Sequence, residues 1–177
     1  NFILEREELT HALYDLQQEG KLPLRVTHND TKLNNIMIDD ETGKGICVID
    51  LDTVMPGLAA HDFGDSVRFG ASTAAEDEKD LSKMEMNLER FRVFTRGYVR
   101  ACPGLTAKEL ELLPMGAKNM TMECGVRFLT DYLDGDHYFA VHRDGQNLDR
   151  ARTQFKLVAD MEKKWDKMRR IVEEEAK

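Results

Sequence analysis

The sequence is poor in cysteine, in positive charge and in long apolar runs. Its three cysteines, Cys47, Cys102 and Cys124, are odd in number and lack the spacing of metal ligands. They therefore indicate buried free thiols in a reducing cytoplasm rather than a disulfide framework or a zinc site. No apolar run approaches the roughly 20 residues that a membrane-spanning helix needs. The net charge of −8 argues against a nucleic-acid partner, which requires a basic face.

No signal peptide, internal repeat or low-complexity linker is visible, and the rest of the composition is that of a globular domain. The chain has 177 residues, of which 41% are hydrophobic and 33% charged, enough for one domain with a real core. Apolar residues at helical spacing predict helices over residues 3–19, 59–69, 84–98, 106–113, 117–132 and 147–172. Short apolar runs predict strands at 24–27, 36–38 and 46–49. We expect a mainly α protein with a small β-hairpin sheet, an α+β fold.

Local signals define several of the predicted boundaries. Gly20 is placed to end the first helix, and Thr106 begins a capping box with a Glu three residues later. Pro114 predicts a break or kink near residue 113, and Asn147 is expected to cap the last helix. Residues 53–57 read as a turn, and the small, acidic residues 71–80 as a mobile loop.

One stretch concentrates polar side chains around the predicted hairpin, whose strands are residues 36–38 and 46–49. Asp30 and Asn35 precede the first strand, and Asp50 follows the second. Because antiparallel pairing returns the chain to its starting end, Asn35 and Asp50 should lie side by side, with Asp30 above them. Such a set of oxygen ligands suits a hard cation such as Mg²⁺ together with its phosphate ligands.

The spacing His28-x-Asp30-x-Lys32-x-x-Asn35, followed by Asp50 after a hairpin, resembles the catalytic loop and metal-binding Asp of protein kinases. It is more similar to the aminoglycoside phosphotransferase and choline kinase superfamily, where a small residue follows the His. The segments HNDTKLNN, IDLDTVMPG and HDFGDSVRFG resemble its N-acetylhexosamine 1-kinase branch. The resemblance runs from about residue 9 to residue 165. The alternative is a polar turn in which Asp30 and Asn35 are only turn formers.

The resemblance implies the large, carboxy-terminal lobe of a protein-kinase-like fold. Its catalytic loop would occupy residues 27–53 and a helical, substrate-side subdomain residues 59–177. Such enzymes normally have a preceding β-rich lobe with a flexible phosphate-covering loop and a strand Lys. No Gly-rich hairpin precedes His28 here. We therefore expect residues 1–177 to lack the amino-terminal nucleotide lobe of the same polypeptide, to be inactive alone, and to expose apolar surface that could drive dimers.

Side-chain chemistry and the resemblance together suggest roles in phosphoryl transfer. Asp30 is the expected catalytic base, which accepts a hydrogen bond from the acceptor hydroxyl and orients it. Asn35 and Asp50 offer oxygens to Mg²⁺, which bridges the phosphates of ATP. Lys32 resembles the protein-kinase lysine that contacts the transferred phosphate, a residue that aminoglycoside kinases often lack.

Two further residues are expected to organise the loop. His28 is interpreted as a hydrogen-bonding organiser rather than a proton carrier. Asp52 is placed beside the metal rather than on it, because in this superfamily the first Asp after the hairpin is the metal ligand.

Five residues are candidates for the acceptor site. Asp65 and Arg68, three apart on a helix, would either pair structurally or contact substrate. Phe69 and Tyr138 would either pack against a sugar ring or belong to the core. Arg127 is the strongest candidate, because an Arg within an apolar helical stretch needs a partner.

The leading interpretation is an ATP- and Mg²⁺-dependent cytoplasmic kinase that phosphorylates a small molecule, an N-acetylhexosamine at its anomeric 1-hydroxyl. Within the same class, the acceptor would instead be choline, ethanolamine, homoserine or an aminoglycoside. In another class, the chain would be a non-catalytic pseudokinase or binding module, against which the intact Asp30, Asn35 and Asp50 argue. Neither nucleic acid nor a membrane is an expected partner.

Overall fold

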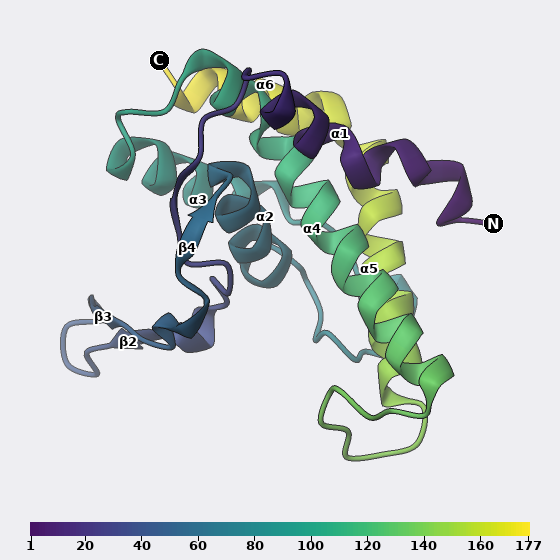
Figure 1. Ribbon diagram of the computed structural model, residues 1–177. Helices are drawn as coiled ribbons and strands as arrows, with labels where there is room; N and C mark the ends of the chain where they lie inside the picture. The colour runs from purple at the N-terminus through teal and green to yellow at the C-terminus, as the bar shows by residue number, and fades with distance from the viewer.

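Helices form most of the computed structural model, which describes residues 1–177 (Figure 1). The α-helices are α1 (Glu7–Gln18), α2 (Ala59–Gly70), α3 (Leu88–Ala101), α4 (Ala107–Asp134), α5 (Gln146–Lys163) and α6 (Trp165–Glu175). Two short antiparallel ladders complete the fold: β1 (Arg25–Thr27) pairs with β4 (Met55–Gly57), and β2 (Ile36–Ile38) with β3 (Gly45–Val48). The predicted class, mainly α with a small β component, is confirmed. No helix combines the length and apolar character that crossing a membrane requires.

The centre of the fold is the crossing of α2 and α4, where two glycines bring the backbones into contact. A Cβ atom on Gly116 would lie 2.0 Å from the Ala60 carbonyl oxygen, and one on Gly64 would lie 2.3 Å from the Gly116 oxygen. No larger residue fits at either position without separating the helices. Around this crossing, α2, α3, α4, α5 and α6 share a buried apolar cluster that includes Phe63, Phe91, Leu113, Leu157, Met161 and Met168.

Two of the predicted helix boundaries are confirmed in detail. Gly20 has a positive φ of 73°, and the Lys21 amide donates to the Leu16 carbonyl, so α1 ends in a Schellman motif. Thr106 and Glu109 form a reciprocal capping box at the start of α4.

The predicted break at Pro114 is wrong, because α4 continues through it to Asp134. A proline inside a helix removes one backbone hydrogen bond and costs about 3 kcal/mol. Leu113 and Ala117, on either side of it, are completely buried against the other helices. Tertiary packing therefore keeps helical a segment that local preference would interrupt.

The predicted single helix over 147–172 is also wrong. It divides at Lys164 into α5 and α6, and the Lys164 ammonium contacts Asp160 at 2.7 Å and the Met86 carbonyl at 3.0 Å. Asn147 does not cap α5, since Gly145 occupies that position with φ 70°. The Asn147 side chain is instead fully buried.

Residues 55–57, predicted as part of a turn, form strand β4 against β1. The register pairs Arg25 with Gly57 and Thr27 with Met55. Gly57 is required there, because a Cβ would lie 2.4 Å from the Thr27 hydroxyl. The strand has only three residues and contains a proline, so its pattern alone does not distinguish it from a turn.

The cysteines are free, as predicted, but they are not buried in the core. Cys47 is exposed on the hairpin, while Cys102 and Cys124 are half-buried. The hairpin stands away from the helices, which leaves the Cys47 side chain without a layer to cover it (Figure 1).

Candidate active site

The loop before the hairpin is fixed by two aspartates from the first turns of α2. The Asp62 carboxylate accepts hydrogen bonds from the backbone amides of His28 and Asn29, both at 2.8 Å. Asp65 accepts one from the Thr31 amide, also at 2.8 Å. Backbone groups that no secondary structure satisfies are thereby paired, and the loop is held in one conformation around Asp30.

Asp30 lies at the centre of a cluster of polar side chains. Its carboxylate accepts hydrogen bonds from the Lys32 ammonium and the Asn35 amide nitrogen, each at 2.8 Å. Burial opposes ionisation, but the bonds from Lys32 and Asn35 outweigh it and hold the pKa of Asp30 below its ordinary value. Asp30 is therefore an ionised acceptor at neutral pH, suited to orienting a hydroxyl.

His28 connects this loop to the end of the hairpin. Its Nδ1 accepts from the Asp30 amide at 3.3 Å, which leaves Nε2 to donate to the Ile49 carbonyl at 2.9 Å. The Ile49 amide in turn donates to the Asn35 carbonyl at 2.9 Å. The residue after Ile49 is Asp50, so the hairpin brings Asp50 back beside Asn35.

The oxygens of Asn35 and Asp50 fit a hard cation. The Asn35 nitrogen is used by Asp30, and its amide oxygen accepts no hydrogen bond. The exposed Asp50 carboxylate also has no hydrogen-bonding partner, and Asp50 adopts the left-handed backbone conformation with φ 62°, which is uncommon for a residue other than glycine. Hydrogen bonding to Asp30 raises the pKa of Lys32, and the nearby charge of Asp50 adds to this.

The protein alone does not form a complete metal cage. No group of three or more His, Cys, Asp or Glu side chains has the geometry to hold a metal ion. Two oxygen ligands from the chain, with the rest from phosphates and water, is the arrangement expected for Mg²⁺ bound with a nucleotide. Asp52 is exposed on the short helical turn after Asp50.

Asp65 and Arg68 form the structural ion pair that was one of their two predicted roles. The Arg68 guanidinium is 9% exposed and lies 3.0 Å from Asp65 and 2.6 Å from Glu76. Asp65 thus joins the loop around Asp30 to the segment after α2. Phe69, 37% exposed, lines a neighbouring cavity of about 290 Å³ with Arg68, Ser72, Glu76 and Arg90.

Arg127 and Tyr138 meet at the far end of α4. The Arg127 guanidinium donates to the Tyr138 hydroxyl at 3.3 Å and lies 5.4 Å from the centre of the Phe139 ring. They line a shallow depression of about 370 Å³. Arg127 was predicted to need a partner within an apolar helical stretch; Tyr138 is such a partner, but Arg127 itself is exposed, so burial does not require the contact.

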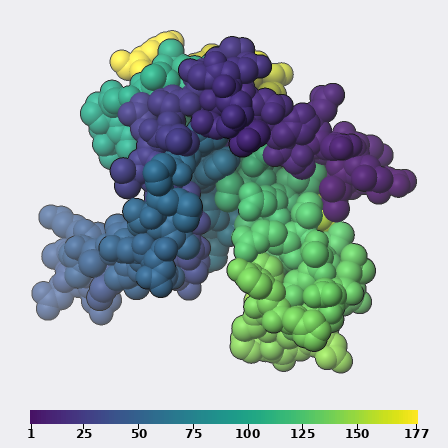
Figure 2. All heavy atoms as spheres, in the orientation of Figure 1, coloured from purple at the N-terminus to yellow at the C-terminus, as the bar shows by residue number.

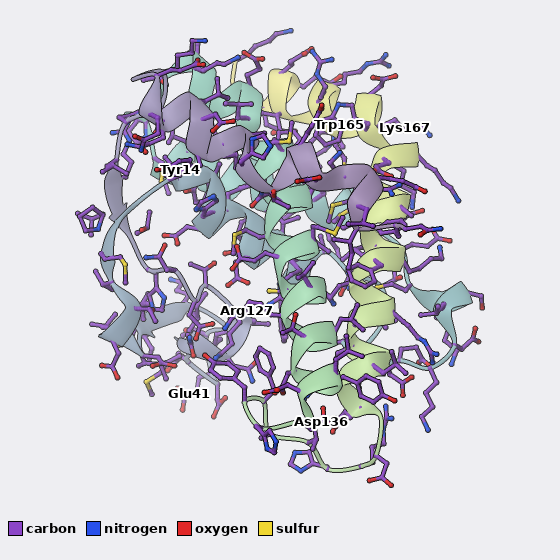
Figure 3. The ribbon with its side chains drawn as sticks, turned by 45° about the vertical axis from the view of Figure 1, so that its right-hand side comes forward. Tyr14, Glu41, Arg127, Asp136, Trp165 and Lys167 are labelled. Carbon is purple, nitrogen blue, oxygen red and sulfur yellow. The ribbon has the colours of Figure 1, made fainter.

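The hairpin and the end of α4 lie on either side of a hollow in the surface (Figure 2). In Figure 2 the hairpin region and the lower part of α4 are separated by a deep indentation below α2. Figure 3 labels Arg127 on the side of α4 towards the hairpin, with Asp136 at the end of the same helix. Phe69 lines a different cavity and is not brought together with Arg127.

The sequence did not reveal the residues that hold the loop at 28–31 in place. The sequence motifs assign no role to Asp62, Asn29 or Thr53. The Asn29 side chain donates to the Thr53 carbonyl at 3.0 Å, and Thr53 donates to the His28 carbonyl at 2.5 Å. The available signal was the Asp62-x-x-Asp65 spacing at the start of a helix, which aligns two carboxylates on one face.

A mainly helical domain with an Asp–Lys–Asn cluster at the base of a small hairpin fits the protein-kinase-like fold. The model of the APH phosphotransferase enzyme family matches residues 3–94, just over half of the 177 residues. The chain therefore belongs to this family, and the match includes the loop around Asp30, the hairpin and α2. ATP-dependent phosphoryl transfer to a hydroxyl of a small molecule is the activity that the family implies.

Proposed function

We propose that this chain carries the catalytic lobe of an ATP- and Mg²⁺-dependent kinase whose acceptor is an N-acetylhexosamine, phosphorylated at its anomeric 1-hydroxyl. The observation that carries the proposal is the Asp30 carboxylate, ionised and held by Lys32 and Asn35 at 2.8 Å, next to an Asp50 carboxylate with no partner. If Asp30 and Asn35 only formed a polar turn, neither the Lys32 contact nor an unpaired Asp50 beside them would be needed. The family membership supplies the reaction class, and the choice of sugar rests on the sequence motifs.

In this proposal Asp30 accepts the hydrogen bond of the acceptor hydroxyl and aligns its oxygen with the γ-phosphorus. Lys32 leaves Asp30 to contact the transferred phosphoryl group, whose charge it offsets. Asn35 and Asp50 would hold Mg²⁺, which neutralises phosphate charge when bound. His28 keeps Asp30 and the hairpin in register, and Asp52 lies beside the metal position.

Arg127 and Tyr138 are the proposed acceptor contacts. Arg127 has hydrogen-bond donors beyond the one given to Tyr138, and both side chains are exposed, Tyr138 by 73%. The Tyr138 and Phe139 rings stand nearly perpendicular, with centres 4.7 Å apart, and offer aromatic faces to a pyranose. For Asp65 and Arg68 the buried ion pair favours loop support, and Phe69 remains a more distant candidate.

A covering lobe is the proposed partner for the hairpin face. Strands β2 and β3 and the residues after them expose many large apolar side chains beside the loop that carries Asp30: Ile36, Met37, Ile38, Ile46, Val48, Ile49, Leu51 and Val54. A monomer rarely leaves so many together uncovered. We propose that the nucleotide lobe of the same polypeptide covers this face, and that the uncovered chain self-associates and does not turn over ATP.

The acceptor assignment is tested by steady-state kinetics on the full-length protein with Mg²⁺-ATP. N-acetylhexosamines should give the highest kcat/KM, above choline, ethanolamine, homoserine and aminoglycosides by at least tenfold. A higher kcat/KM for an amine would replace the sugar assignment and keep the phosphotransferase. No turnover of any acceptor would favour a pseudokinase. The 177-residue chain by itself should show no turnover, and measurable activity would contradict the need for a covering lobe.

A further inference from the structure

One carboxylate, that of Asp131, holds the backbone of the loop that carries Tyr138 and Phe139. Asp131, 6% exposed in the last turn of α4, accepts hydrogen bonds from three consecutive backbone amides, those of His137 at 3.0 Å, Tyr138 at 2.8 Å and Phe139 at 2.9 Å. Burial opposes ionisation, but the three amide bonds outweigh it and hold the pKa of Asp131 below its ordinary value. The side chain is therefore charged while it holds the loop.

A buried asparagine fixes the carboxylate from the other side. Asn147, completely buried on α5, donates to Asp131 at 2.8 Å and to Asp136 at 2.9 Å. Its own oxygen accepts from Arg150 at 2.9 Å, and Arg150 also donates to the Ala140 carbonyl at 3.1 Å. Asp131 is thus locked between α5 and the loop, so its oxygens have fixed positions.

The consequence is a defined position for two aromatic residues, the exposed Tyr138 and the half-buried Phe139. Tyr138 is 73% exposed and has few packing contacts of its own. Phe139 packs on Phe128 of α4 with ring centres 4.7 Å apart. The backbone bonds to Asp131 therefore determine where the Tyr138 hydroxyl meets Arg127.

We infer that Asp131 is a positioning residue of the acceptor site, which sets acceptor affinity by holding residues 137–139 against Arg127. The inference rests on the proposed function, since it assumes that the Arg127–Tyr138 depression receives the acceptor. Asp131 is not placed in contact with substrate. Its effect should appear in the KM for the acceptor and not in phosphoryl transfer, because Asp30 belongs to a separate set of contacts.

The first measurement is hydrogen exchange of the amides of residues 137–139, which does not depend on activity. In Asp131→Asn the side chain keeps one acceptor oxygen and gains an NH₂ that cannot accept, so these amides should exchange at least tenfold faster than in the unmodified protein. Asp131→Glu, which keeps the carboxylate one methylene further out, should give an intermediate rate. Asp144→Asn is the control, an exposed carboxylate in the same loop with no hydrogen bond.

The second measurement is the KM and kcat of the full-length protein with the acceptor that it turns over best. Asp131→Asn should raise the acceptor KM at least tenfold and leave kcat and the KM for ATP within twofold, with Asp131→Glu between. Unchanged exchange would show that Asp131 does not hold the loop. Faster exchange with an unchanged acceptor KM, or a fall in kcat alone, would overturn the positioning role.

These outcomes are separable from failure of the proposed function. If sugars are not substrates, the same KM comparison is made with the amine or aminoglycoside that is, and the exchange result stands independently. If Asp131→Asn does not fold, Asp131→Glu decides by the same two measurements.

Discussion

Asp62 accepts hydrogen bonds from two consecutive amides, and Asp65 from a third, in the loop that presents Asp30. Neither carboxylate is part of the proposed chemistry. Both act through backbone geometry, since the loop has no strand or helix to satisfy its amides. Asn29, in this loop, adopts a left-handed backbone conformation with φ 63°. Its amide bond to Asp62 helps to hold that conformation.

Replacing Asp62 with Asn should therefore lower kcat without unfolding the protein. The amide can accept only with its oxygen, so the loop loses one of its two amide bonds to this side chain. A displacement of about 1 Å at the reacting groups costs on the order of a hundredfold in rate. Steady-state kinetics of the full-length protein measures this, with Asp40→Asn on the exposed hairpin turn as the matched control. Equal rates for both variants would show that the α2 contacts are dispensable.

The α2–α4 crossing shows how a helix pair can depend on the absence of a side chain. At Gly116 and Gly64 the two backbones touch, and α4 remains helical through Pro114 because its neighbours are buried against α2 and α5. This crossing supports the first turns of α2, where Asp62 and Asp65 reside. The packing of α2 against α4 thus affects the position of the loop around Asp30, because Asp62 and Asp65 bond to that loop.

Gly116→Ala is expected to destabilise the protein by about 1–3 kcal/mol, because the new methyl group overpacks the crossing. Gly97→Ala is the matched control: Gly97 lies in α3 with no atom within 4 Å of an added Cβ, and alanine there should stabilise by about 0.5–1 kcal/mol. Urea unfolding of both variants measures the difference. A Gly116→Ala protein as stable as the parent would mean that the helices separate at little cost.

Features with a local cause could be predicted from the sequence, and features with a distant cause could not. The hairpin, the Gly20 stop and the Thr106 capping box depend on neighbouring residues, and all three are present. The proximity of Asp30 and Asn35 followed from their spacing. Strand β4 exists only because β1 lies beside it, and the continuity of α4 depends on helices far along the chain. The role of Asp62 required knowing that α2 folds under residues 28 and 29.

Outside the apolar core, ion pairs connect segments of the chain that are distant in sequence. Arg25 of β1 donates two hydrogen bonds to Glu109 at 2.9 and 2.8 Å, which ties the β1–β4 ladder to the start of α4. Arg92 and Arg96 of α3 form ion pairs with Glu175 at the end of α6, at 2.9 Å and 2.7 Å. These pairs fix the end of α6, which extends to Glu175, three residues beyond the predicted helix end at residue 172.

The Arg25–Glu109 pair should make stability depend on pH. The bonds from Arg25 lower the pKa of Glu109 from its ordinary value of 4.5. A lowered carboxyl pKa contributes stability that is fully present above the ordinary value and is lost as the pH falls through the lowered one. Glu109→Gln should therefore reduce the unfolding free energy by about 1–3 kcal/mol at pH 7, with a difference that shrinks below pH 4.5.

Chemical denaturation between pH 3 and 7 checks this expectation, with Glu111→Gln on the exposed side of the same helix as the control. The control should change stability little, since exposed ion pairs contribute about 0–1 kcal/mol. A Glu109→Gln deficit that stays constant across the pH range would attribute the effect to packing and not to the charge.

The role of Asp30 is tested most directly by the kcat of full-length Asp30→Asn with Mg²⁺-ATP and the preferred acceptor. Loss of a positioned general base lowers kcat by about 10²–10⁴-fold. We expect a decrease in that range, with circular dichroism and thermal unfolding close to those of the parent protein. A correctly folded Asp30→Asn variant that retains the parent kcat would contradict the assignment.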